Sequence, residues 1–169
     1  MVFATFVIVM AKDMKTNAAR LLDKAGVSYR IIPYEYDPDD LAAQHVADAL
    51  GEDINRVFKT LVLFGERAGH FVCVVPGNAE VDLKKAARAA GAKKADLIPM
   101  KELLPLTGYI RGGCTPIGMK KPFPVFFHHT ATGFSEIFVS AGQRGLQLAV
   151  DPADLIAYTG AAVTDLIKD

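Results

Sequence analysis

The chain has 169 residues, of which 51% are hydrophobic, and its 19 basic side chains equal its 19 acidic ones. A chain of this length can bury a sizeable core, so we expect one domain, and the balanced charge by itself predicts no charged partner. Two cysteines, Cys73 and Cys114, exclude a disulfide framework and indicate the reducing cytoplasm.

The N-terminal stretch is apolar over residues 1–10. It lacks the basic start and the length of a signal peptide, and it is too short to span a membrane. Met10 and Met14 are alternative starts of the chain. We therefore treat residues 1–14 as an N-terminal extension of undecided status, expect no membrane association, and expect the domain to cover residues 15–169.

Helix and strand signals follow one another irregularly in the first half of the domain. Thr16 and Gly26 have the residue types of an N-cap and a C′ position, which predicts a helix over residues 17–25. Pro33 within residues 28–36 predicts an edge strand or a bulge. The other elements expected here are a helix over 41–50, an antiparallel strand pair over 57–64 and 71–75, and a helix over 83–90 capped by Asp82.

The second half adds short strands around an irregular loop, because residues 108–118 are too rich in glycine and proline to be regular. Asp151, Pro152 and Asp154 are typical of a helix start, and Gly160 would end that helix. The other elements expected here are strands over 95–98, 125–128, 136–140, 146–150 and 161–167 and a short helix over 101–107. We therefore expect an α+β fold whose mixed, mostly antiparallel and barrel-like sheet is flanked by helices.

Lys59 lies inside the apolar run of residues 57–64. Period-two alternation gives this strand two apolar faces, one of which carries the lysine. Because an ammonium buried without a partner costs several kcal/mol, the side chain either snorkels to the strand end or points into a cleft where a ligand supplies the missing partner. We take the cleft as the working hypothesis.

The glycine loop, residues 112–118, is a candidate binding loop. Gly112 and Gly113 lack a Cβ, so the main chain can approach a carbonyl or phosphate oxygen closely. A plain turn is the alternative. Cys114 in this loop could be a nucleophile, although no histidine lies near it in the sequence.

A second loop, residues 140–145, follows a predicted strand. It offers the hydroxyl of Ser140, the flexible Gly142 and the guanidinium of Arg144, all of which suit a polar ligand. It could equally be a simple hairpin connection.

The common catalytic, phosphate-binding and metal-binding motifs do not occur in this sequence. His128 and His129 are adjacent within a predicted strand, so we expect their side chains to point to opposite faces and not to share a metal. The sequence therefore predicts neither a metal nor a cofactor.

The segment from residue 84 to residue 121 holds nine basic and two acidic side chains. Such an excess suits a polyanion, although a solvated basic face has the same pattern. The residues expected to contact a polyanion are Lys84, Lys85, Arg88, Lys93, Lys94, Lys120 and Lys121.

Four ordered blocks resemble the signature blocks of the YbaK family, also called the YbaK/prolyl-tRNA-synthetase-associated domain. They cover residues 57–62, 75–77, 106–118 and 139–147, and the similarity runs from about residue 15 to the end. Four blocks in the same order are far more specific than any one of them.

The resemblance implies a trans-acting aminoacyl-tRNA deacylase, most like the branch that clears cysteine mischarged onto proline tRNA. Lys59 matches the essential lysine of the family, and Gly112 and Gly113 match the loop that receives the aminoacyl carbonyl. The residues assigned to substrate binding are Ser140, Thr60, Tyr29, Phe58, Gly142 and Arg144. The partners implied are aminoacylated tRNA, held by the basic segment, and prolyl-tRNA synthetase.

In this branch, the resemblance implies no protein nucleophile. The cysteinyl thiol of the substrate attacks its own ester carbonyl, which releases the tRNA and a cyclic thiolactone. Lys59 would then position and polarise the ester, and Cys114 replaces the small residue of other members. Two alternatives stay open: a deacylase for alanine or another small amino acid that uses water, and a non-catalytic module that binds tRNA or a synthetase.

Overall fold

Five α-helices and eight strands make up residues 14–169, the part of the chain that the computed structural model describes. The expectations for residues 1–13 lie outside this part. The helices are α1 (Asn17–Ala25), α2 (Ala43–Leu50), α3 (Leu83–Ala90), α4 (Leu103–Thr107) and α5 (Pro152–Thr159). The strands are β1 (Tyr29–Pro33), β2 (Phe58–Gly65), β3 (Gly69–Pro76), β4 (Ala95–Leu97), β5 (Val125–His128), β6 (Ile137–Ser140), β7 (Leu146–Val150) and β8 (Ala162–Thr164).

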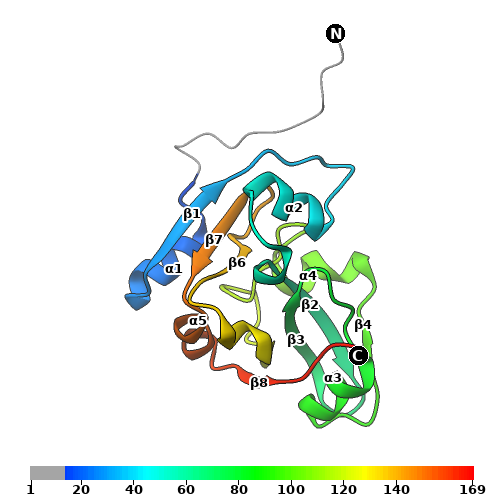
Figure 1. The fold of residues 1–169 in the computed structure, drawn as a ribbon. Helices are drawn as coiled ribbons and strands as arrows, with labels where there is room; N and C mark the ends of the chain where they lie inside the picture. Colours follow the sequence, from blue (N-terminus) through cyan, green and yellow to red (C-terminus); the bar gives the residue numbers. More distant parts are fainter. Residues whose placement is uncertain (1–13) are drawn as a thin grey trace.

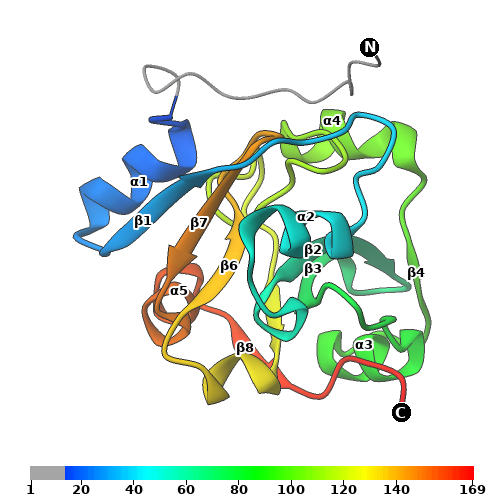
Figure 2. The ribbon, with the colours of Figure 1, turned by 45° about the horizontal axis from the view of Figure 1, so that its top comes forward.

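The strands form two sheets that lie side by side (Figures 1 and 2). The smaller sheet has the order β1-β7-β6 and is antiparallel, whereas the larger has the order β4-β2-β3-β5-β8 and is mixed, because β5 pairs in parallel with both β3 and β8. Between the described strands of the two sheets, the one bridge joins Val57 to Phe138. The mixed α+β fold is confirmed, but the expected barrel-like closure is wrong, because a single bridge does not continue one sheet into the other.

Side-chain caps fix the helix starts that the sequence predicted. The Thr16 hydroxyl accepts a hydrogen bond from the Ala19 N–H at 3.2 Å, and the Asp151 carboxylate accepts one from the Ala153 N–H at 2.8 Å. Asp82 caps α3 in the same way. Each such cap typically stabilises a helix by about 1 kcal/mol, which explains why these boundaries could be read locally.

Other boundaries differ by a few residues. β1 ends at Pro33, as befits an edge strand, because proline cannot donate to a ladder. The expected helix over 41–50 begins at Ala43. The expected helix over 101–107 divides into a 3₁₀ turn at Met100–Glu102 and α4, where Pro105 is tolerated because the first turn of a helix leaves its N–H groups unpaired. Over residues 14–169, no helix is long and apolar enough to cross a bilayer.

The strand β2 separates two hydrophobic clusters. Phe58 and Val62 pack into the main core with the strands of the smaller sheet, whereas Leu63 packs into a second core beneath α3. Phe64 is 49% exposed, so the two apolar faces that the sequence predicts for this strand are not both buried at its end. Part of the edge of β2 is not paired with another described strand, and this part lines a cavity.

Candidate functional site

A cavity of about 440 Å³ lies along the open edge of β2. At one end of this edge Val57 bridges Phe138 of β6, and at the other end the Ile98 N–H donates to the Val62 carbonyl at 3.2 Å. Because β4 pairs with β2 only from Leu63 onward, no described strand covers the edge between these points. Main-chain groups two residues apart point the same way, so Thr60 directs its N–H and C=O to the side on which the Val62 carbonyl meets Ile98, where the cavity lies.

Lys59 lines this cavity and is half-buried. Burial lowers the pKa of its ammonium below the usual lysine value, and the negative charge of Glu80 partly opposes that shift. Within residues 14–169, no hydrogen bond or ion pair holds its Nζ. The lysine therefore lies in a cleft without a protein partner, while its catalytic role stays a prediction.

Gly112 and Gly113, the first two glycines of the glycine loop, have different surroundings. Gly112 lines the cavity at φ 84°, and a Cβ there would lie 3.1 Å from Leu41 Cδ2. A Cβ on Gly113 would lie 3.1 Å from Gln143 Cα, so this glycine lets the two loops touch. The Gly113 N–H donates to the Ile110 carbonyl at 2.9 Å and is therefore not available to a substrate carbonyl.

The second loop supplies one lining residue and one brace. Ser140 lines the cavity, and its Oγ accepts a hydrogen bond from the Gly142 N–H at 3.1 Å. The Arg144 Nε donates to the Arg111 carbonyl at 2.9 Å, which ties this loop to the glycine loop. Neither Gly142 nor Arg144 is part of the lining, so both act on the shape of the wall.

Of the other predicted pocket residues, Phe58 and Thr60 line the cavity and Tyr29 does not. The Tyr29 hydroxyl donates to the Asp23 carboxylate and accepts from the Lys15 ammonium, both at 2.8 Å. Tyr29 begins β1, the outer strand of the smaller sheet, and that register holds it away from β2.

Gln147 is a lining residue that the sequence analysis did not single out. It is 4% exposed and pairs with Ser140 across β6 and β7. Among the described residues, its Oε1 has no hydrogen-bond partner, and the same holds for the Thr60 Oγ1. Both atoms are closed to solvent although their residues line the cavity, and the Gln147 side chain also forms a hydrogen bond with Tyr34. The available signal was a polar residue within an apolar strand, the same signal that marked Lys59.

Cys114 also lines the cavity. Burial raises the pKa of its thiol to about 12, so the group is a neutral thiol at physiological pH. No shift toward the reactive thiolate is present, which argues against the nucleophile alternative.

The rest of the lining is largely apolar. One wall precedes and includes the start of α2, and the other runs from β4 to α4; their apolar residues are Leu41, Ala42, Ala43, Val46, Leu97, Ile98, Met100 and Leu103. The charged lining residues are Lys59 and Arg111, and the described residues contribute no carboxylate. The cavity therefore suits a ligand that is apolar in part and not cationic overall.

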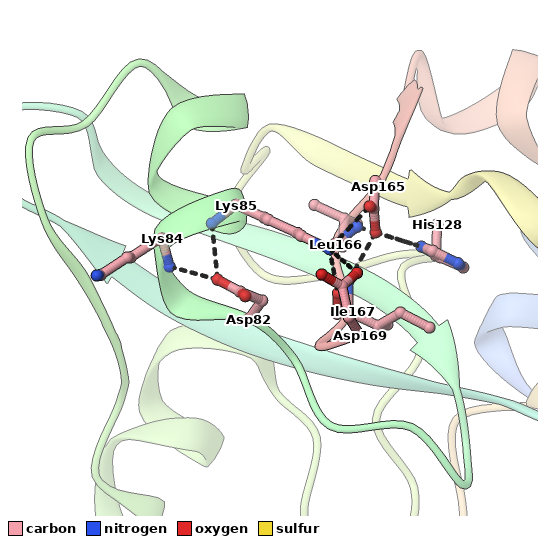
Figure 3. Close-up of polar contacts among 8 residues, drawn as sticks. All are labelled: Asp82, Lys84, Lys85, His128, Asp165, Leu166, Ile167 and Asp169. Carbon is pink, nitrogen blue, oxygen red and sulfur yellow. Dashed lines mark hydrogen bonds and ion pairs between the residues drawn. The ribbon is translucent and has the colours of Figure 1, made fainter.

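The predicted polyanion contacts are exposed at six positions, Lys84, Arg88, Lys93, Lys94, Lys120 and Lys121. Lys85 differs, because its Nζ contacts Asp165 at 2.8 Å, Asp169 at 3.0 Å and the Ile167 carbonyl at 2.8 Å (Figure 3). We call Lys85, Asp165, Ile167 and Asp169 the C-terminal clasp. Its contacts hold the end of the chain against α3, and Lys85 is not free to bind RNA.

His128 and His129 do not point to opposite faces, so that expectation is wrong. β5 ends at His128 and a 3₁₀ turn begins at His129, which brings the two ring centroids to 4.3 Å. Donor atoms of both rings and of Asp165 lie within 4.8 Å of one another, close enough to hold a metal ion. The His128 Nδ1, however, accepts from the Leu166 N–H at 3.2 Å, and Asp165 is held by Lys85 (Figure 3). A metal at that nitrogen would have to displace the first bond and compete with the second.

The aminoacyl-tRNA editing domain matches residues 37–158, which include the cavity. A relative from Enterococcus faecalis, named as a candidate Cys-tRNA(Pro)/Cys-tRNA(Cys) deacylase, EbsC, is 44% identical over 91% of this chain and 94% of its own. The chain belongs to the aminoacyl-tRNA editing domain family. The YbaK resemblance is thus confirmed, and aminoacyl-tRNA editing is the activity of this family.

Two further similar proteins differ in how much of their own length this chain covers. A solved structure described as a candidate trans-editing enzyme for prolyl-tRNA synthetase superposes with a TM-score of 0.77 at 28% identity and covers 91% of this chain and 99% of that one. The proline–tRNA ligase of Fervidobacterium nodosum is 28% identical over 64% of this chain, which corresponds to 19% of the ligase. The editing domain thus resembles both a chain of similar size and a segment of a synthetase.

Proposed function

We propose that this protein is a trans-acting deacylase that removes mischarged cysteine from proline tRNA in the cytoplasm. The observation that carries the proposal is Lys59, which has no partner within residues 14–169 and lies in a cavity to whose lining these residues contribute neither a carboxylate nor a histidine. With no carboxylate or imidazole base among the described lining residues to activate a water, the cavity suits a substrate that brings its own nucleophile. The name of the Enterococcus faecalis relative supports cysteine as that substrate.

The ester carbonyl would lie between the Lys59 ammonium and the main chain of Gly112. Charge develops on the carbonyl oxygen as it is attacked, and donors fixed in a half-dry cavity stabilise that charge more than water does. Gly113 then positions the loop and does not donate to the substrate, because its N–H is already bound to Ile110.

The amino group of the substrate would bind beside Thr60 and Gln147, two polar residues of the lining. Their Oγ1 and Oε1 atoms are buried and lack partners, so this contact requires the two side chains to turn toward the N–H donors of the cysteinyl amine. This contact would fix the conformation of the cysteinyl group, which is what an intramolecular attack requires.

The reaction itself is an internal transfer of the acyl group. The cysteinyl sulfur forms a bond to its own carbonyl carbon, the bond from that carbon to the ribose oxygen breaks, and the thiol proton ends on the ribose hydroxyl. The products are deacylated tRNA and a cyclic thiolactone. Lys59 polarises the ester and is neither a nucleophile nor a Schiff-base former.

The exposed basic residues would hold the tRNA. The six side chains other than Lys85 supply a salt-dependent attraction for phosphates that does not read sequence. Selection of proline tRNA would then rest on prolyl-tRNA synthetase as a partner, in keeping with the synthetase relative that carries this domain.

The experiment that tests the proposal is a deacylation panel on proline tRNA charged with cysteine, alanine or serine. We expect release of cysteine only, with the thiolactone trapped as a product by a soluble amine. Release of alanine would favour attack by water. Salt-dependent tRNA binding without release of any amino acid would favour a binding module and overturn the deacylase.

A further inference from the structure

We propose that an aromatic row at the end of the larger sheet, Phe64, His70 and Phe123, binds an unpaired base of RNA, which stacks on Phe64. The row lies outside the cavity, because none of its three residues belongs to the cavity lining. The inference rests on the proposed function in so far as tRNA is the RNA that reaches the row. It adds a contact of a different kind to the phosphate contacts of the exposed lysines.

The strand register builds the aromatic row. Phe64 of β2 is the partner of His70 of β3. On the next strand Val72 pairs with Val125, so Phe123 and His70 each lie two residues before the paired position. The ring centroids are 5.0 Å apart for Phe64 and His70 and 5.6 Å apart for His70 and Phe123. The three rings are therefore in contact across three neighbouring strands.

The row is exposed because the core ends there. Val62 and Val72, the next pair inward on the same face of the sheet, are buried in the main core. Phe64 is 49% exposed, whereas His70 and Phe123 are partly buried. The His70 ring meets the Phe64 ring at 65°, an edge contact that holds Phe64 without covering it as a stacked ring would. A flat aromatic ligand can therefore stack on the exposed part of Phe64.

The charges beside the row favour a phosphate backbone. Lys120 and Lys121, just before Phe123, are exposed, and within residues 14–169 no hydrogen bond or ion pair holds their ammonium groups. The segment over residues 103–135 contains no acidic residue. At the other end of the row Asp96 lies opposite Phe64 and offsets the positive charge there. We therefore expect the phosphates on the side of Lys121.

This arrangement fits a single strand of RNA. From β2 to β5 the distance is two strand spacings, about 10 Å, which is about the length of three nucleotides at 3.4 Å each. One strand can thus place a base on Phe64 and phosphates near Lys121. In a duplex the bases are paired and stacked on one another, so only an unpaired base can cover the ring.

The test measures how the full-length protein binds a short single-stranded RNA and a hairpin duplex with the same number of phosphates, by fluorescence anisotropy at several salt concentrations. The single strand should bind more tightly. Phe64→Ala should weaken its binding about tenfold without a change in salt dependence, because stacking involves no counterion. Lys121→Ala should instead reduce the slope of log K against log[salt] by about one.

Matched variants separate the ring from its apolar bulk. Phe64→Trp should retain the affinity for the single strand, whereas Phe64→Leu should lose most of what Phe64→Ala loses. Val163→Ala is the control, since Val163 is 41% exposed on β8 at the opposite edge of the same sheet, and it should bind as the wild type does.

The proposal is overturned if Phe64→Ala binds the single strand as tightly as the wild type, or if the wild type binds the duplex equally well. Loss of binding to purified prolyl-tRNA synthetase in Phe64→Asp, with RNA binding unchanged, would make the row a protein interface instead. The RNAs carry no amino acid, so these results do not depend on deacylation. Failure of the proposed function would appear separately, as wild-type protein that releases no cysteine from charged tRNA.

Discussion

Lys59 and Lys85 show two opposite ways to keep a lysine in a fold. Lys85 contacts two carboxylates and a main-chain carbonyl, and the hydrogen bonds to the carboxylates of Asp165 and Asp169 raise the pKa of its ammonium. Lys59 has no such contact among the described residues, and burial lowers the pKa of its ammonium. Lys85 is stabilised by partners within the protein, whereas Lys59 is placed to bind a ligand.

The same contrast extends to the surroundings of the two lysines. In the C-terminal clasp, Asp165 binds Lys85 and lies beside His128, whose Nδ1 already accepts from a main-chain N–H (Figure 3). Among the residues that line the cavity, the Lys59 ammonium has no described partner, and the buried Oε1 of Gln147 and Oγ1 of Thr60 have none either. Satisfied polar groups are typical of a structural contact, whereas unsatisfied ones gathered at one cavity favour a binding site.

The largest effect on activity is expected from the removal of Lys59. Lys59→Ala should lower the rate of cysteinyl-tRNA deacylation by about 10²- to 10³-fold, the usual loss for a group that stabilises a developing oxyanion. Because Lys59 is partly desolvated without a partner, its removal should not lower Tm. Deacylation assays and thermal unfolding measure the two quantities.

Lys85→Ala is the matched control for that pair of measurements. It should lower Tm, since it removes the ammonium that donates to Asp165 and to the carbonyl of Ile167, and it should retain wild-type deacylation. The contrast would be broken by a well-folded Lys59→Ala protein with full activity.

An intermediate effect is expected at the glycine loop. Gly112 and Gly108 have nearly the same backbone, with φ of 84° and 83°, so an alanine strains either position by about 1 kcal/mol. A Cβ at Gly108 meets nothing within 4 Å, whereas one at Gly112 meets Leu41 across the cavity wall. Gly112→Ala should therefore lower kcat/KM for deacylation about tenfold, about 1.4 kcal/mol of transition-state stabilisation.

Gly108→Ala should share the loss of stability and keep the activity. Chemical denaturation gives the first quantity and deacylation kinetics the second. Equal activity losses in the two variants would show that backbone strain, and not the cavity wall, is responsible.

The smallest effect concerns pH. If the Lys59 ammonium binds the ester, activity falls as rising pH deprotonates it, and the lowered pKa places this fall below the usual lysine pKa of about 10.4. Lys59→Arg keeps a positive charge above pH 12, so the alkaline fall should disappear while the maximum rate drops, because the guanidinium has a different shape. The rate of spontaneous ester hydrolysis at each pH is subtracted from the measured rate.

The opposite pH profile would change the role of Lys59. Activity that rises through the pKa of Lys59 in the wild type, and is lost at all pH values in Lys59→Arg, would indicate a neutral amine acting as a base. That result would keep the contrast with Lys85 but replace electrostatic stabilisation by proton transfer.

Local signals were sufficient for the helix caps, for most strands and for the two loops that meet at the cavity. Thr16, Asp82 and Asp151 accept hydrogen bonds from main-chain groups two or three residues away, so the helix starts could be predicted from the local sequence. The same holds for Lys59, because a lysine within an apolar strand is anomalous wherever the strand lies. Lys59 and both loops lie within the blocks that carry the YbaK resemblance, and the family match confirmed that resemblance.

Other features depended on contacts between distant segments. The sequence did not show that Tyr29 lies outside the cavity, because its place depends on the pairing of β1 with β7. It also did not show that His128 and His129 lie together, because this depends on the turn after β5. Lys85 looked like Lys84 in the sequence until the end of the chain supplied Asp165 and Asp169.

For the site itself, the sequence alone determined that Lys59 is anomalous and that the loops at Gly112 and Ser140 are able to meet it. Tertiary structure decided which groups are satisfied: Gly113 by Ile110, Lys85 by its carboxylates, and neither Lys59 nor the Oε1 of Gln147 among the described residues. The physical reason is that a residue type fixes which hydrogen bonds and charges a side chain can provide. Whether a partner for them is present depends on the neighbours in three dimensions.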